Sequence, residues 1–163
     1  MVGSEGMVAL PVFLGLKSSN NRAVVQGEGV ALRMKAADLL KECSASDELP
    51  RILRLFTYSM LMQIARSAVC NRFHAIETRL ARWLLMAQDR MGSTEFKITQ
   101  EFLSSMLGVR REAVNKAAGD FQRRKLISYV RGHMSLLDRP ELESLACSCY
   151  GFISTTDALP QTM

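Results

Sequence analysis

The sequence has no uninterrupted apolar stretch of the roughly 20 residues that a membrane-spanning helix needs. The apolar run at residues 7–16 is broken by Pro11 and Gly15, and no basic segment precedes it. It therefore lacks the pattern of a secretory signal. These absences predict a cytoplasmic chain.

Cysteine and histidine are scarce, with four and two residues among 163. The pair Cys147-x-Cys149 is too tight for the usual zinc hairpin, no second pair completes a site, and His74 and His133 stand far apart in the sequence. We interpret all four cysteines (Cys43, Cys70, Cys147 and Cys149) as reduced thiols with a structural role, with redox sensing as the alternative. No metal site and no cofactor is predicted.

Catalytic patterns are also missing. No paired carboxylates, nucleophile–base arrangement or phosphate-binding loop stands out, so an enzyme is the class of protein that the sequence favours least. The hydrophobic content of 48% and charged content of 23% are those of an ordinary folded domain.

Positive charge is present in excess and is concentrated in one place. The chain has 21 Lys and Arg against 16 Asp and Glu, for a net charge of +5. Between Arg110 and Arg131, seven basic residues stand against two acidic ones. A local surplus of this kind is typical of a surface that binds nucleic acid.

The N-terminal part of the chain has the pattern of short strands and turns. Residues 8–16, 23–25 and 30–34 are apolar or β-branched and are separated by turn sequences. Two or three strands alone are hardly stable, so they must pack on the following helix or belong to a sheet that is incomplete here.

Helices are predicted next. Residues 36–43 suggest a short helix, and Leu49 to Cys70 a long one with apolar residues on more than one face. A helix covered on two sides predicts a dimer, although a monomeric core helix is the alternative. The helical pattern then continues from Asn71 to about Met91, and residues 95–98 suggest a short strand.

Residues 99–126 have the pattern of a helix-turn-helix. Thr99 is a suitable N-cap for a helix to about Leu107, with Phe102, Leu103 and Met106 facing inward. Gly108 supplies a turn residue, and a second helix opens at Arg110. The apolar residues of that helix recur every three or four positions and predict its buried side: Val114, Ala117, Ala118, Phe121 and Leu126.

Polar residues at the start of the second helix remain on its outer side, and in helix-turn-helix proteins such residues reach base edges in the major groove. Arg pairs with guanine, Glu accepts from cytosine, Asn reads adenine and Lys adds guanine or phosphate contacts. The predicted readers are Arg110, Arg111, Glu112, Asn115 and Lys116. Residues 127–130 and 134–137 then alternate like a hairpin wing, whose tip carries Arg131 for a phosphate.

These blocks together resemble the bacterial Crp/Fnr family of dimeric transcription regulators. The resemblance is strongest over residues 71–150, in NRFHAIETRLARWLLMAQDR, in ITQEFLSSMLGVRREAVNKAAGDFQRRKLISYVRGHMSLLD and in the tail RPELESLACSCY. The family pattern G-x-[ST]-R-E-x-[VI]-x-[RK] places base-reading residues at Arg111, Glu112 and Lys116, with Arg110 in place of the usual small hydroxyl residue. Thr99 and Gln100 match the family's phosphate contacts.

The resemblance implies a mainly α fold with small β elements: the remnant of a β-roll, a long dimerisation helix and a C-terminal winged helix-turn-helix. Its predicted parts are an incomplete effector-binding roll at 1–36, helices at 37–70, the DNA-binding domain at 71–150 and a tail at 151–163. The partners it implies are double-stranded DNA and a second copy of the chain, and it admits RNA polymerase as a further partner.

The leading hypothesis is therefore a regulator that binds an inverted-repeat DNA site. Two alternatives remain at this point. One is a small-molecule sensor of the cyclic nucleotide type, which would need a complete roll. The other is a fragment that only dimerises with longer relatives and lacks effector control.

Overall fold

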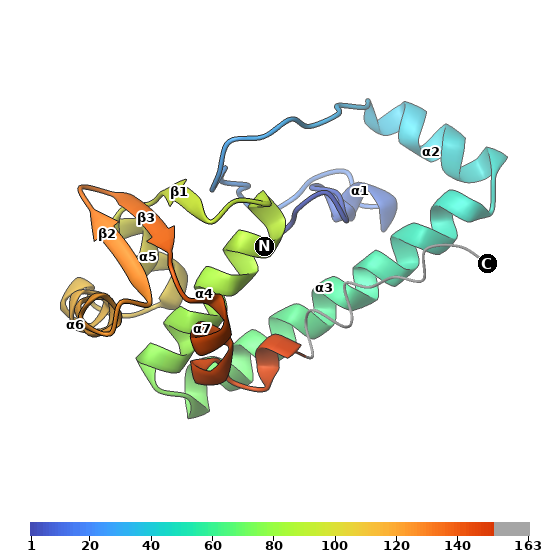
Figure 1. Cartoon of the computed structure of the whole chain (residues 1–163). Coiled ribbons are helices and arrows are strands. Elements are labelled where there is room, and N and C mark those ends of the chain that lie inside the picture. The colour runs from blue at the N-terminus through green and yellow to red at the C-terminus, as the bar shows by residue number, and fades with distance from the viewer. Residues whose placement is uncertain (152–163) are drawn as a thin grey trace.

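The computed structural model describes residues 1–151, so all but Gly151 of the predicted tail lies outside the described residues (Figure 1). The described part is mainly helical with one three-stranded sheet, which confirms the expected fold class. The elements follow in the order α1 (Leu10–Phe13), α2 (Ala36–Ala45), α3 (Glu48–Phe73), α4 (Ile76–Met91), β1 (Glu95–Lys97), α5 (Gln100–Leu107), α6 (Arg111–Arg123), β2 (Ile127–Val130), β3 (His133–Leu136) and α7 (Arg139–Leu145).

The strands predicted in residues 1–34 do not form. The only regular element there is α1, and the rest of the segment has no strand or helix. The apolar residues Val25, Val30 and Leu32 are exposed, because no sheet is available to pair with them. The segment is nevertheless held to α3 and α4: the Met1 amino group donates to Gln63 Oε1 at 2.6 Å, and Glu5 pairs with Arg90 at 3.1 Å. That residues 1–36 belong to an effector-binding roll stays a prediction.

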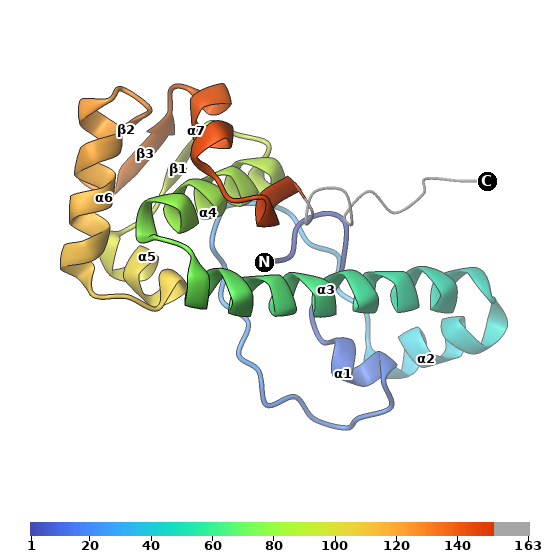
Figure 2. The same cartoon turned by 90° about the horizontal axis from the view of Figure 1, so that it is seen from below.

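The helical run predicted at 71–91 is not continuous. The chain leaves α3 after Phe73, passes through extended backbone at His74 and Ala75, and enters α4 at Ile76. Apolar periodicity could not reveal this break, since both helices are amphipathic on either side of it. The break sets α4 at an angle to α3, so that α4 lies among α5, α6 and α7 while α3 extends away from them (Figure 2).

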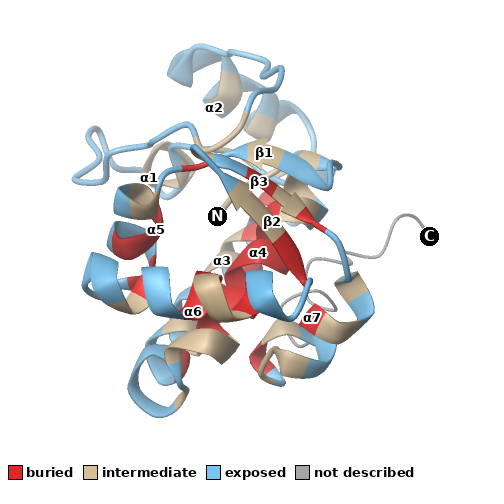
Figure 3. Cartoon of the chain, turned by 60° about the vertical axis from the view of Figure 1, so that its left-hand side comes forward, coloured by how far each residue is buried: buried red, intermediate tan, exposed pale blue. Residues whose placement is uncertain are grey.

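The buried core of residues 80–142 is built around α4. Leu80, Leu84 and Leu85 on this helix are fully buried. Helices α5, α6 and α7 and the sheet surround it, and Figure 3 shows the buried faces of these elements turned inward. The residues predicted as the buried side of the second helix, Val114, Ala117, Ala118, Phe121 and Leu126, are all buried as expected.

The sheet lies at one end of this core, with strand order β1-β3-β2 and both pairings antiparallel. Met134 in the central strand faces Phe96 in β1 and Tyr129 in β2, and it is buried in the core. No helix in residues 1–151 is both long and apolar enough to cross a membrane.

Two glycines in the helix-turn-helix give a matched pair of substitutions with opposite expected signs. Gly108 has φ +62°, whereas Gly119 lies inside α6, and a Cβ at either position would meet no atom within 4 Å. We expect Gly108→Ala to lower the free energy of unfolding by about 1–2 kcal/mol, because a Cβ strains the left-handed backbone. Gly119→Ala should raise it by about 0.5–1 kcal/mol. Urea unfolding of both variants is the measurement, and equal signs would contradict the assignment of the turn.

Candidate nucleic-acid interface

Thr99 begins the first helix of the helix-turn-helix as predicted. Its hydroxyl accepts a hydrogen bond from the Phe102 amide at 3.1 Å, which makes it the N-cap of α5. Leu103 is buried as expected, but Met106 is 40% exposed and Leu107 occupies the inward position instead. The inward placement of Met106 was therefore wrong.

The turn between the two helices is held from both sides. Gly108 ends α5 in the left-handed conformation, and the Val109 amide donates to the Ser104 carbonyl at 3.1 Å. On the side of the core, the buried Arg79 guanidinium of α4 donates to the carbonyl of Leu107. The position of α6 relative to α5 is thus set by backbone geometry and by a side chain from the core.

The second helix presents a polar face at its N-terminal end. Arg110 is the N-cap in extended conformation, and α6 proper begins one residue later, at Arg111. The five side chains predicted to read bases are all exposed: Arg110, Arg111, Glu112, Asn115 and Lys116. Because the opposite face of α6 is buried against α4 and α5, this surface points away from the domain (Figure 3).

Ion pairs divide the basic residues of this region into two groups. Arg123 pairs with Asp120 at 3.0 Å, and Arg124 pairs with Glu141 at 2.7 Å. Arg110 and Lys116 make no ion pair among residues 1–151. The uncompensated positive charge therefore lies at the start of α6, where the helix dipole adds to the attraction for an anion.

Arg111 connects the two helices with the wing. Its Nε donates to Gln100 Oε1 at 3.4 Å, so the start of α5 and the start of α6 meet at this point. Burial raises the pKa of the Tyr129 phenol in β2, and the positive charge of Arg111 partly opposes this shift. Gln100, Arg111 and the wing thus belong to one continuous surface.

The predicted wing is present, with β3 beginning one residue earlier than expected. The Tyr129 hydroxyl donates to the Ile98 carbonyl at 2.8 Å, and the Ile98 amide donates to the Gly132 carbonyl at 2.8 Å. These bonds hold a tight turn in which Arg131 (φ +50°) and Gly132 (φ +82°) are both left-handed. Arg131 is exposed at the tip, and its contact with a phosphate stays a prediction.

Comparison with known proteins agrees with this geometry. A family model for the Crp-like helix-turn-helix domain matches residues 78–145. This segment is a Crp-like helix-turn-helix domain. No curated protein matches the chain.

Solved structures share the fold of the chain. They include a regulator of the Crp/Fnr family from Eubacterium rectale (TM-score 0.52, 24% identity, 68% of this chain and 51% of that one) and a CRP-family transcriptional regulator from Thermus thermophilus (0.54, 21%, 62% and 55%). A third is FixK2 from Bradyrhizobium japonicum (0.58, 17%, 71% and 60%). The chain therefore matches between about half and three fifths of the length of these proteins.

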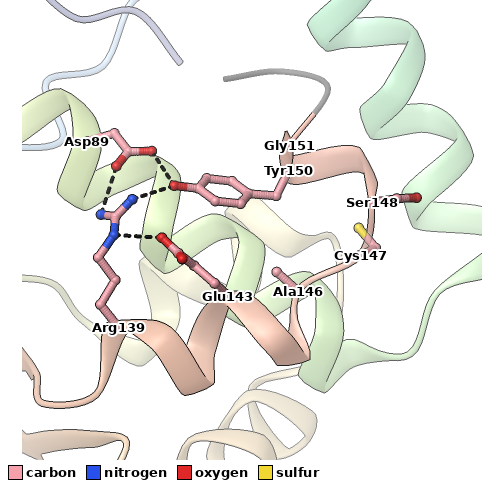
Figure 4. Close-up of a pocket in the computed structure, with 8 residues that line it drawn as sticks. All are labelled: Asp89, Arg139, Glu143, Ala146, Cys147, Ser148, Tyr150 and Gly151. Atoms are coloured by element: carbon pink, nitrogen blue, oxygen red, sulfur yellow. Dashed lines mark hydrogen bonds and ion pairs between the residues drawn. The ribbon is translucent and has the colours of Figure 1, made fainter. Parts of the chain in front are cut away.

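Arg139, at the start of α7, connects the C-terminal end of the Crp-like domain to α4. The Arg139 guanidinium contacts Asp89 at 2.9 Å, donates to the Tyr150 hydroxyl at 2.7 Å and pairs with Glu143 at 2.7 Å. These side chains line an open cavity of about 550 Å³ (Figure 4). Because these hydrogen bonds and ion pairs connect α7 and Tyr150 to α4, we interpret the cavity as a structural junction between these segments.

Tyr150 gives this junction a pH dependence. Its hydroxyl donates to Asp89 at 2.8 Å, and burial together with this bond raises its pKa from 10.0 to about 12. Between these values the folded state keeps a proton that the unfolded state releases, so stability falls as pH rises. We expect the stability advantage of wild type over Tyr150→Phe to shrink from pH 10 to 12 in urea unfolding. An advantage that stays constant over that range would contradict the shift.

One group of side chains was not anticipated as a site. Cys70, His74, Cys147 and Cys149 are brought together by the fold, and their donor atoms lie within 4.8 Å of one another. The sequence does not indicate the complete group, because Cys70 and His74 precede Cys147 by 77 and 73 positions. The signal that could have found the group is Cys70-x3-His74, a four-residue spacing that puts two donors on one side of a helix end.

Proposed function

We propose that the chain is a sequence-specific DNA-binding transcriptional regulator that binds an inverted-repeat site as a homodimer, with the N-terminal end of α6 in the major groove. The observation that carries this proposal is the exposed polar face at the start of α6, where Arg110 and Lys116 make no ion pair within the described residues. This face belongs to a segment that matches the Crp-like helix-turn-helix family. The proposal places the chain with the DNA in the cytoplasm, and RNA polymerase is the further partner such a regulator would contact.

The residue types suit two kinds of contact with DNA, one with base edges and one with phosphates. Arg111, Glu112 and Lys116 would contact base edges, and Arg110 and Asn115 lie beside them. Thr99, Gln100 and Arg131 lie around this face, at the start of α5 and at the wing tip, and would contact phosphates. The Thr99 hydroxyl accepts from Phe102, so its own proton remains available for a phosphate oxygen.

A second copy of the chain is the proposed partner of α3. Tyr58, Leu61, Ala65 and Ala68 are exposed on this helix at alternating spacings of three and four residues. This spacing is that of a coiled-coil seam, where two identical helices bury each other's apolar residues. Ile64 and Val69 beside the seam are also exposed and would widen the contact.

Selection of binding sites from random duplex DNA, followed by a salt series, tests the proposal. The expected result is an enriched inverted repeat whose half-sites lie about one helical turn apart, roughly 34 Å. The logarithm of the binding constant should fall with the logarithm of salt by about 0.9 per neutralised phosphate. Enrichment of no sequence at low salt would overturn the DNA-binding proposal.

The dimer is tested separately by a charge placed in the seam. We expect Leu61→Glu to convert the protein to a monomer, because two facing carboxylates would be forced into the apolar contact. Sedimentation equilibrium measures the mass, and affinity for the inverted repeat should fall with it. Leu40→Glu on α2 is the matched control, since Leu40 is an exposed helical leucine outside the seam and should leave the dimer intact. A monomeric wild type would refute this part of the proposal.

A further inference from the structure

The four donor side chains named above come from two places on either side of the Crp-like domain. Cys70 lies in the last turn of α3, and His74 is the residue that ends this helix. Cys147 and Cys149 follow α7, which ends at Leu145. Cys70 and Cys149 are buried, and the other two are half-buried.

The donor atoms are spaced closely enough to share one ion. Cys70 Sγ lies 3.5 Å from Cys147 Sγ and 3.4 Å from His74 Nδ1, and all four donors lie within 4.8 Å of one another. In a tetrahedral zinc site with Zn–S bonds of about 2.3 Å and Zn–N bonds of about 2.0 Å, donors are about 3.5–3.8 Å apart. Two of the separations already have this size, and the widest exceeds it by about 1 Å.

The donor chemistry selects the kind of metal. Three sulfurs and one imidazole form the Cys₃His set of structural zinc sites. Calcium and magnesium require oxygen ligands, and no carboxylate belongs to this cluster. Iron–sulfur clusters are usually held by four thiolates, which the group does not supply. We propose that Cys70, His74, Cys147 and Cys149 form a structural zinc site.

The surroundings suit the charge of such a site. Three thiolates around Zn²⁺ leave one net negative charge, which must be balanced in a partly buried position. Burial raises the pKa of the Cys149 thiol, and the positive charges of Arg82 and Arg66 oppose this shift. Arg82 is itself buried, and it donates to Ser67 on α3 at 3.4 Å, so its charge is held in place.

A disulfide between Cys70 and Cys147 is the competing interpretation, since their sulfurs are 3.5 Å apart. It would use two of the four donors and would give no role to Cys149 or to the imidazole that faces Cys70. A metal ion uses all four. It also fits the reduced thiols that the sequence analysis expects.

The proposed zinc site would connect segments that lie on both sides of the Crp-like domain in the sequence. Cys70 and His74 precede the Crp-like domain at 78–145, and Cys147 and Cys149 follow it. A single ion would therefore tie both ends of this domain to the end of α3. The extended residues His74 and Ala75 between α3 and α4 would be held at that point, and with them the direction in which α6 is presented.

Metal analysis of the full chain, purified without chelators or metal-affinity resin, tests the proposal. We expect about one zinc ion per chain. Cys147→Ser and His74→Gln should each lower the zinc content or affinity about tenfold or more. Cys43→Ser is the matched control, because Cys43 is a half-buried cysteine on α2 outside the cluster, and it should keep its zinc.

Cobalt titration of the metal-free wild type gives a second readout that does not depend on folding of a variant. Thiolate-to-cobalt charge transfer and the strong visible bands of tetrahedral Co²⁺ are expected, and zinc should displace them. Wild type that contains no zinc and gives no such bands would overturn the proposal. So would equal zinc loss in Cys43→Ser, or a metal-free Cys70–Cys147 disulfide in anaerobically purified protein. Zinc content is measured without DNA, so its result is independent of the DNA-binding proposal.

Discussion

Replacement of Lys116 by alanine is expected to weaken binding to the selected DNA site by about 1–3 kcal/mol and to relax the preference at one base position of each half-site. Arg111→Ala should have an effect of the same size at a different position. Both side chains are exposed in the first two turns of α6, on the face opposite the core. Removing either one takes away a donor to base edges without leaving a cavity.

Arg123→Ala is the matched control for these two substitutions. Arg123 is a basic residue in the last turn of the same helix, and its charge is already paired with Asp120 at 3.0 Å. It should therefore change affinity little, and equally for all sequences. The measurement is a binding titration of each variant against the selected site and against single-base variants. A uniform loss for Lys116→Ala and Arg111→Ala would remove the base-reading role from these residues.

The second large effect is expected in the core. Leu84→Ala should lower the free energy of unfolding by about 2–5 kcal/mol, because Leu84 is fully buried on α4, around which the other helices of the domain pack. The lost methyl groups leave a cavity that these neighbours cannot close completely. Urea unfolding followed by circular dichroism measures the change.

Leu137→Ala separates burial from residue type in that experiment. Leu137 follows β3 in the same domain and is 58% exposed, so its truncation should change stability by no more than about 0.5 kcal/mol. Comparable losses for the two variants would mean that α4 is not the centre of the core. DNA binding by Leu84→Ala should fall only to the extent that the domain unfolds, because the Leu84 side chain is fully buried and cannot contact DNA.

The helix-turn-helix is the part of the chain that local sequence signals describe best. Thr99 caps α5, Gly108 forms the turn, and the apolar residues of α6 lie on its buried face. Each of these features depends on interactions within a few residues or on a periodicity that any amphipathic helix must obey. The exposed face of α6 follows directly, because side chains that are not at the buried positions must face outward.

Two sequence predictions failed where the outcome depended on distant parts of the chain. Val30 and Leu32 have the residue types of a strand, but a strand needs a neighbour, and residues 1–34 find none. The continuous helix expected from Asn71 to Met91 is divided at His74 and Ala75, because α3 and α4 pack in different directions.

Residue types alone predict the basic second helix after a glycine turn, the wing that follows it and the absence of a long apolar span. These are properties of residue type and local spacing. Which basic residues make ion pairs with other elements depends on the folded chain, since Arg124 pairs with Glu141 of α7 while Arg110 and Lys116 make no ion pair within the described residues. The tertiary structure also brought Cys70 and His74 beside Cys147 and Cys149. The grouping of these four side chains requires two segments more than 70 residues apart to meet in space, so the local spacings Cys70-x3-His74 and Cys147-x-Cys149 each indicate only half of it.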